Sequence, residues 1–184
     1  MKERVDTSAR ISPELVSRQR VRHRQLYYMT PLDVIFQEVM KMSFNQKESL
    51  PEIKKVVVIN APKAEVWKAI ATSEGIAGWW LKNDFRPIEG YKFKIHDDSF
   101  GDSQCVVTRV DPPTHLEFDW DNDWHLGFRL KEIDTNKTEL TFTHSGWFSN
   151  KKTRFGQPHE QVLKIMDAGW EKGIRVKLVR YVEK

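Results

Sequence analysis

Apolar and polar residues alternate along much of the chain, first in one short stretch and later in five consecutive segments. The stretch Ile53–Ile59 is rich in β-branched residues and predicts a strand. The five later segments are separated by turn residues and predict an antiparallel meander with one apolar face. They cover residues 91–96, 104–110, 116–120, 124–131 and 140–144. The inward-facing residues of the second segment are not fixed, because residues 105–107 are all apolar.

Helical spacing replaces this alternation in two regions. Pro62 begins one short predicted helix, and Ser73 is the expected N-cap of a second that ends at Trp80. Pro158 begins a helix that continues almost to the C-terminus. Its apolar stripe predicts a helix buried at the centre of the core, since each buried apolar side chain contributes about 1.5–3 kcal/mol. The stripe consists of Leu163, Met166, Trp170, Ile174, Leu178 and Tyr181.

Two glycines lie beside this stripe and lower the helix propensity of the segment. Gly169 and Gly173 are expected either to let the sheet approach closely or to leave space. The order of elements therefore predicts an α+β fold in which a curved antiparallel sheet wraps around a long C-terminal helix. An apolar hollow is expected between the sheet and the helix.

Residues 1–50 differ in character and are predicted to form a helical extension and linker, separate from a domain at 51–184. One helix face in the extension is apolar, with spacing i, i+3, i+4, i+7 and i+8. We expect this face either to pack on the domain or to bind a protein partner. A third possibility is a start codon placed too far upstream, in which case residues 1–41 are never made. The face consists of Leu32, Ile35, Phe36, Val39 and Met40.

Composition excludes several classes of protein. The chain has 184 residues and a single cysteine, Cys105, which rules out an intrachain disulfide and fits a reducing compartment. No apolar run reaches the roughly 20 residues that span a bilayer, and no secretory signal core is present. We therefore predict a cytoplasmic protein without a membrane span.

The net charge of +4 belongs mainly to the extension, where nine basic residues face six acidic ones. The domain is nearly neutral, with twenty-one basic and twenty acidic residues. Broad binding to nucleic acid requires a positive face that displaces counterions from phosphates, so we predict none for the domain.

No motif with metal, cofactor or catalytic chemistry is found. The sequence lacks H-x-x-x-H, G-x-S-x-G, a P-loop and G-x-G-x-x-G. The acidic run at 119–123 resembles the start of a calcium loop, but Trp124 and Leu130 occupy the positions that need Gly and Glu. We therefore predict no metal ligands, no cofactor and no catalytic residues.

His144 is the polar residue of greatest interest, because it shares a strand face with Phe142 and Leu140. One interpretation is a hydrogen-bonding group at the end of an apolar pocket, which orients a ligand or acts as an acid or base. The other is a core histidine satisfied by a backbone carbonyl or by Tyr181. Trp124 and Trp147 are expected to guard the mouth of a cavity.

Aromatic side chains on the predicted inner faces are candidates for the lining of this cavity. Ordinary packing is the alternative, since aromatic residues bury large areas in any core. The candidate ligand-binding set is Trp80, Phe93, Phe118, Trp120, Phe128, Phe142, His144, Met166 and Trp170.

Five stretches, taken in order, resemble a known family: VVVINAPKAEVWKAIATSEGIAGWW, NDFRPIEGYKF, VDPPTHLEFDW, THSGW and DAGWEKG. They are similar to the Hsp90-ATPase-activator-homologue-like branch of the START/Bet v 1 superfamily, also called SRPBCC proteins. The resemblance covers about residues 50–184. It implies the helix-grip fold and a cavity between the sheet and the C-terminal helix.

The resemblance does not imply Hsp90 activation, because the eukaryotic namesake has a separate chaperone-binding domain for which residues 1–50 are too short. Three functions remain open. The first is a cytoplasmic module, monomeric or homodimeric, that binds an apolar or amphipathic small molecule. The second is a protein-interaction or stress-associated module related to chaperone cofactors. The third is a cavity enzyme that uses His144 with a bound water.

Overall fold

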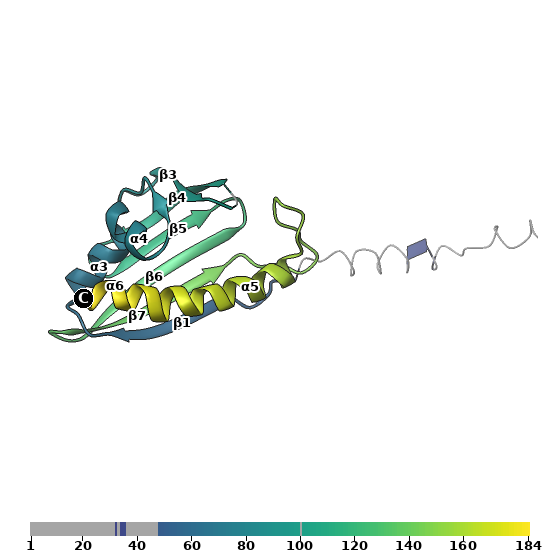
Figure 1. Cartoon of the computed structure of the whole chain (residues 1–184). Coiled ribbons are helices and arrows are strands. Elements are labelled where there is room, and N and C mark those ends of the chain that lie inside the picture. Colours follow the sequence, from purple (N-terminus) through teal and green to yellow (C-terminus); the bar gives the residue numbers. More distant parts are fainter. Residues whose placement is uncertain (1–31, 33, 36–47, 100) are drawn as a thin grey trace, which may run out of the picture. The chain divides into compact units, whose positions relative to one another are not determined.

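A computed structural model describes residues 32, 34, 35, 48–99 and 101–184 of the chain (Figure 1). The chain divides into two units, Met1–Gln46 and Lys47–Lys184. In the first unit, Leu32, Val34 and Ile35 are helical and exposed. The remaining members of the predicted apolar face, Phe36, Val39 and Met40, lie outside the described residues, so the partner-binding role of that face stays a prediction.

The second unit contains a seven-stranded antiparallel sheet with the strand order β1-β7-β6-β5-β4-β3-β2. Consecutive strands from β2 to β7 are neighbours, and β1 pairs with β7 at the far edge. The sheet is strongly curved (Figure 1). Its strands are β1 (Ile53–Ile59), β2 (Lys82–Asn83), β3 (Lys92–Asp97), β4 (Gly101–Asp111), β5 (His115–Trp120), β6 (Trp124–Asp134) and β7 (Lys137–Ser145).

The helices lie on one face of this sheet (Figure 1). The C-terminal helix starts after Pro158, as predicted, and runs along β7 and β1. A π-helical segment interrupts this helix. The last turn of the helix, after that segment, contacts α3. The helices are α3 (Lys63–Ala71), α4 (Ser73–Trp79), α5 (His159–Lys172), the π-helix η1 (Gly173–Leu178) and α6 (Val179–Val182). The predicted α+β helix-grip arrangement is therefore confirmed.

One local prediction needs correction near α4. The N-cap is Thr72 rather than Ser73, because the Thr72 hydroxyl accepts the Gly75 N–H at 3.0 Å. Ser73 instead donates its hydroxyl to the carbonyl of Asn83 at 2.7 Å. Asn83 belongs to the short edge strand β2, which pairs with β3.

The C-terminal helix buries the middle of its predicted stripe. Trp170, Ile174 and Leu178 are buried, whereas Leu163, Met166 and Tyr181 are only partly buried. The helix is also held by Lys55 of β1, whose ammonium lies 2.9 Å from Asp167 and 3.0 Å from Glu171. Burial alone would lower the pKa of Lys55, but these two hydrogen-bonded carboxylates raise it.

The two glycines of this helix have different surroundings. Gly169 is exposed, and a Cβ there would meet no described atom within 4 Å, so of the two expected alternatives the sheet does not approach closely here and open space lies beside the helix. Gly173 is buried, and a Cβ there would lie 3.5 Å from the Trp170 ring and 3.9 Å from the Trp79 ring.

Strand β4 has a defined phase that the sequence left open. Cys105 and Val107 point into the core, each 1% exposed. Burial raises the pKa of the Cys105 thiol, so this cysteine is held as the unreactive thiol. Within the described part of the chain, no helix is both long and apolar enough to cross a membrane.

Candidate functional site

The residues predicted to line a cavity do come together between the sheet and the C-terminal helix. Their rings form a continuous series of contacts, with centroids 4.4 to 6.1 Å apart. Met166 is partly buried beside them. We call the eight rings the aromatic cluster: Trp80, Phe93, Phe118, Trp120, Phe128, Phe142, His144 and Trp170.

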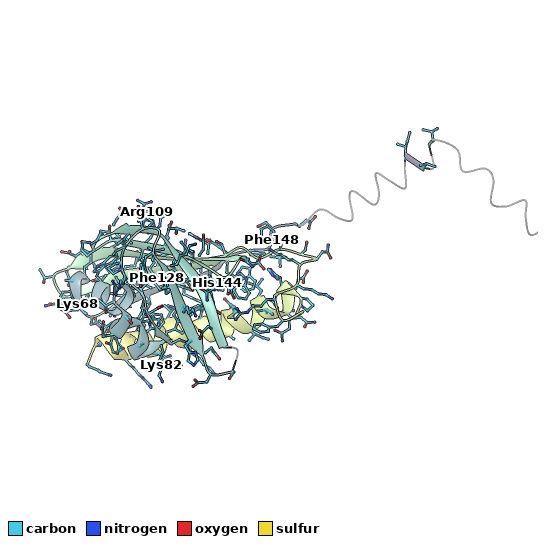
Figure 2. All side chains as sticks on the ribbon, turned by 90° about the horizontal axis from the view of Figure 1, so that it is seen from above. Lys68, Lys82, Arg109, Phe128, His144 and Phe148 are labelled. Carbon is cyan, nitrogen blue, oxygen red and sulfur yellow. The ribbon has the colours of Figure 1, made fainter. Side chains whose placement is uncertain are left out.

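Members of this cluster differ in exposure. Trp80 is half-buried at the end of α4, whereas the other seven rings are buried. Phe142 lies against Trp170 with centroids 4.4 Å apart, and Phe128 lies 5.1 Å from Phe142. Figure 2 shows Phe128 and His144 inside the body of the domain. The structure therefore shows these aromatic rings packing against one another, while their role as a ligand-binding lining stays a prediction.

His144 is fully buried on the inner face of β7, as the alternation predicted. Its hydrogen-bond partner is neither a backbone carbonyl nor Tyr181. Instead, the indole N–H of Trp170 donates to His144 Nδ1 at 2.9 Å. Burial lowers the pKa of the His144 imidazole to about 3, so the ring is neutral at physiological pH.

This hydrogen bond fixes the tautomer of His144. Nδ1 accepts a hydrogen bond, so the single proton of the neutral ring is on Nε2. Among the described residues, Nε2 of His144 has no hydrogen-bond partner. It is therefore a buried donor without an acceptor.

Three further buried ring nitrogens have no hydrogen-bond partner within the described part of the chain: Nε1 of Trp120, Nε1 of Trp124 and Nε2 of His159. The rings of Trp120, Trp124 and His144 form a triangle, with centroids 5.2, 5.5 and 5.8 Å apart. His159 lies next to it, 6.2 Å from Trp124. We call these four residues the donor group.

His159 is the least isolated member of the donor group. Its Nδ1 accepts the Phe148 N–H at 3.4 Å, and its Nε2 lies 3.5 Å from a carboxylate oxygen of Asp123. Burial lowers the pKa of His159, although Asp123 opposes this effect. The sequence does not indicate that His159 belongs to this group, because His159 occupies the first turn of α5, where the sequence shows only a helix start.

Trp147 does not guard a cavity mouth as expected. It is fully buried, and its indole N–H donates to the backbone carbonyl of His144 at 3.0 Å. Trp124 is partly buried and packs on Trp147 with centroids 5.1 Å apart. Gly146, next to Trp147, has φ +90°, and a Cβ there would overlap the Asp123 carbonyl, so this close approach requires glycine.

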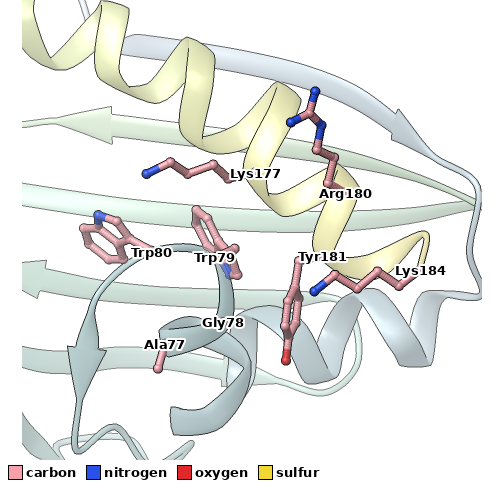
Figure 3. Close-up of a pocket in the computed structure, with 8 residues that line it drawn as sticks. All are labelled: Ala77, Gly78, Trp79, Trp80, Lys177, Arg180, Tyr181 and Lys184. Atoms are coloured by element: carbon pink, nitrogen blue, oxygen red, sulfur yellow. The ribbon is translucent and has the colours of Figure 1, made fainter.

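A separate groove lies between α4 and the end of the C-terminal helix (Figure 3). Its volume is about 380 Å³. Trp80 belongs to both this groove and the aromatic cluster. No sequence pattern predicted the groove, because it depends on which helices meet. Its lining consists of Ala77, Gly78, Trp79, Trp80, Lys177, Arg180, Tyr181 and Lys184.

Neither region contains recognisable metal or nucleophile chemistry. The described residues hold no group of three or more His, Cys, Asp or Glu side chains that could bind a metal ion. What the donor group offers is a set of neutral N–H groups in an apolar surrounding, which can hold an oxygen acceptor.

Comparison with known proteins places this fold in one class, the helix-grip domains of the START/Bet v 1 type. The sequence model described as activator of Hsp90 ATPase homolog 1-like protein matches residues 60–183. The chain belongs to this family. No curated protein sequence matches it significantly.

Solved structures agree with this assignment. Protein BH1534 of Bacillus halodurans is 40% identical, with 73% of this chain and 99% of that chain covered and a TM-score of 0.67. Protein MLL2253 of Mesorhizobium loti is 26% identical, with coverages of 71% and 96% and a TM-score of 0.59. The Aha1 dimer of Colwellia psychrerythraea is 20% identical, with coverages of 73% and 97% and a TM-score of 0.59, and it shares the fold.

Proposed function

We propose that the domain binds a small apolar or amphipathic molecule that carries an oxygen acceptor, at the donor group, which shares Trp120 and His144 with the aromatic cluster. The observation that carries this proposal is the set of buried ring nitrogens without acceptors. Buried polar groups are nearly always hydrogen-bonded in folded proteins. Three exceptions in adjacent rings, those of Trp120, Trp124 and His144, point to a common partner of suitable chemistry, whereas His159 has the Asp123 carboxylate 3.5 Å away.

The chemistry of the donor group defines the ligand. Leaving one buried donor unpaired costs about 1–3 kcal/mol, and a ligand oxygen that accepts from it recovers this free energy on binding. The surrounding rings offer apolar contact area, which favours an aromatic or aliphatic body. A carbonyl or hydroxyl oxygen on such a body can accept from two of the three neutral N–H donors, those of Trp120, Trp124 and His144.

The tryptophan indole N–H groups provide a direct test by NMR. The indoles of Trp79, Trp147 and Trp170 already donate within the protein, to the Ala69 carbonyl, the His144 carbonyl and His144 Nδ1. Those of Trp120 and Trp124 have no acceptor among the described residues. The first three are therefore internal controls for the last two.

The experiment titrates isotope-labelled full-length protein with acetonaphthone and, separately, with naphthalene, which lacks the carbonyl oxygen. We expect acetonaphthone to move the indole signals of Trp120 and Trp124 downfield and to bind more tightly than naphthalene. Trp124→Phe should reduce this preference, while Trp67→Phe, at a partly buried position outside the cluster, should leave it unchanged. Failure of both compounds to bind, together with a ligand-free protein in native mass spectrometry after purification, would overturn the proposal.

A further inference from the structure

The groove between α4 and the C-terminal helix carries a second site, and we infer that it binds a small organic anion with a flat aromatic or apolar body. This site is distinct from the donor group and goes beyond the proposed function. Its volume of about 380 Å³ falls in the range of small-molecule pockets, roughly 300–1,000 Å³. The inference rests on charge, on the aromatic lining and on the local backbone.

Charge is the first observation. Lys177, Arg180 and Lys184 line the groove, and its lining includes no acidic residue. Within the described residues, none of these three cations forms an ion pair. Elsewhere in the domain many cations are paired, as Lys55 is with Asp167. Three unpaired positive charges around one groove favour an anionic ligand.

The aromatic lining is the second observation. Trp79 and Trp80 contribute two stacked rings, with centroids 6.0 Å apart and planes 24° from parallel. Tyr181 lies across from them, with the Lys184 ammonium 5.2 Å from the centre of its ring (Figure 3). A flat apolar body can lie on the partly buried rings of Trp80 and Tyr181 while its anionic group meets the lysines, which identifies the ligand as an aromatic or amphipathic carboxylate, sulfonate or phosphate.

The backbone around the groove is built for close contact. Gly78 of α4 faces Tyr181, and a Cβ at this position would overlap the Tyr181 ring, so glycine lets the tyrosine lie against the helix. Lys177 belongs to the π-helix η1, and π-helical turns inside α-helices are frequent at functional sites. Gly78 therefore brings Tyr181 against α4, in a groove that Lys177 also lines.

Anilinonaphthalene sulfonate (ANS) and N-phenylnaphthylamine are a matched pair of fluorescent probes, since the second lacks the sulfonate. Dissociation constants for both are measured on full-length protein. In Lys177→Gln/Lys184→Gln we expect ANS to bind roughly two- to fivefold more weakly for each charge removed, with N-phenylnaphthylamine unchanged. Added salt should weaken ANS binding to the wild-type protein and have little effect in the double variant.

The control is Lys164→Gln/Lys172→Gln, which removes two exposed charges from the same helix outside the groove. Equal ANS affinities in the two double variants would overturn the inference, because net charge alone would then explain the binding. ANS-induced NMR shifts confined to the donor group would also overturn it. Neither result contradicts the proposed function, which is tested separately with neutral compounds and the indoles of Trp120 and Trp124.

Discussion

Histidines on the two faces of the sheet have opposite surroundings. On the inner face, His144 is buried among aromatic rings, and burial lowers its pKa. On the outer face, His115 Nε2 lies 2.6 Å from Glu117, and His125 Nδ1 lies 2.8 Å from Asp119. One face therefore keeps a histidine neutral and leaves it a spare donor, whereas the other surrounds its histidines with acceptors. The difference shows why an unpaired nitrogen on the inner face is a feature that needs explanation.

The largest expected effect comes from Trp170, which packs against Phe142 and donates to His144 on the inner face. Trp170→Ala should lower the free energy of unfolding by about 3–5 kcal/mol, because it removes a large buried ring and leaves a cavity. Urea denaturation measures this change. Ile165→Ala, at an exposed position of the same helix, should cost no more than about 0.5 kcal/mol. Similar losses in both variants would mean that the helix does not bury Trp170.

The second effect concerns the pH dependence that His144 confers. Its pKa is lowered from 6.5 to about 3, so the unfolded state binds a proton in this range that the folded state does not. The stability linked to this group is complete above pH 6.5 and falls with decreasing pH, by about 1.4 kcal/mol for each pH unit. His144→Asn keeps an oxygen that can accept from Trp170 but does not titrate.

We therefore expect the free energy of unfolding of His144→Asn to decrease less steeply below pH 6.5 than that of the wild type. Urea denaturation at a series of pH values gives both slopes. Parallel slopes would show that His144 is protonated in the folded state and would remove the contrast between the two faces.

Sequence patterns predict the elements of this fold better than the partners of its side chains. The alternation in β7 correctly placed His144 with Phe142 on the inner face, because the direction of a side chain in a strand depends on local geometry alone. The bond from Trp170 to His144 joins residues 26 positions apart, so no local pattern reveals it. The position predicted for Trp147 was wrong for the same reason, because its burial depends on contacts with Trp124 and His159 of other elements.

The sequence also does not predict the groove between α4 and the C-terminal helix, because the groove depends on contacts between distant elements. Lys177, Arg180 and Lys184 look in sequence like the solvated face of a helix, and only the contact between α4 and the C-terminal helix brings Trp79 and Trp80 to them. Gly78 was the available signal, because a glycine within a predicted helix often marks a close approach. The π-helix changes the hydrogen-bond register of the C-terminal helix, and helical periodicity in the sequence does not predict such a change.

A smaller effect is expected from Glu117 on the outer face. Burial alone would raise the pKa of Glu117, but its hydrogen bond with His115 and the charges of His125 and Arg129 lower it. The stability that Glu117 contributes is therefore present above its ordinary pKa of 4.5 and is lost as the pH falls. Glu117→Gln should cost about 1 kcal/mol at neutral pH, with the loss shrinking toward acidic pH.

Urea denaturation of Glu117→Gln is compared with that of Glu52→Gln, an exposed position with no ion pair among the described residues. The control variant Glu52→Gln should change the free energy of unfolding very little at every pH. A cost for Glu117→Gln that persists at acidic pH would show that the outer face depends on the shape of this side chain rather than on its charge.

The smallest effect is expected at His96 of β3, which is exposed and lies 2.7 Å from Asp102. This hydrogen bond raises the pKa of His96, so the sign is opposite to that of His144. The stability it contributes is complete below pH 6.5 and disappears as the pH rises through the raised pKa. NMR titration of the ring signals gives the comparison directly. As the pH is lowered, His96 should gain its proton while the pH is still above 6.5, whereas His144 should stay neutral until about pH 3. If both rings titrated together near pH 6.5, inner-face burial would not control the charge of His144, and Nε2 would no longer be identified as a neutral donor.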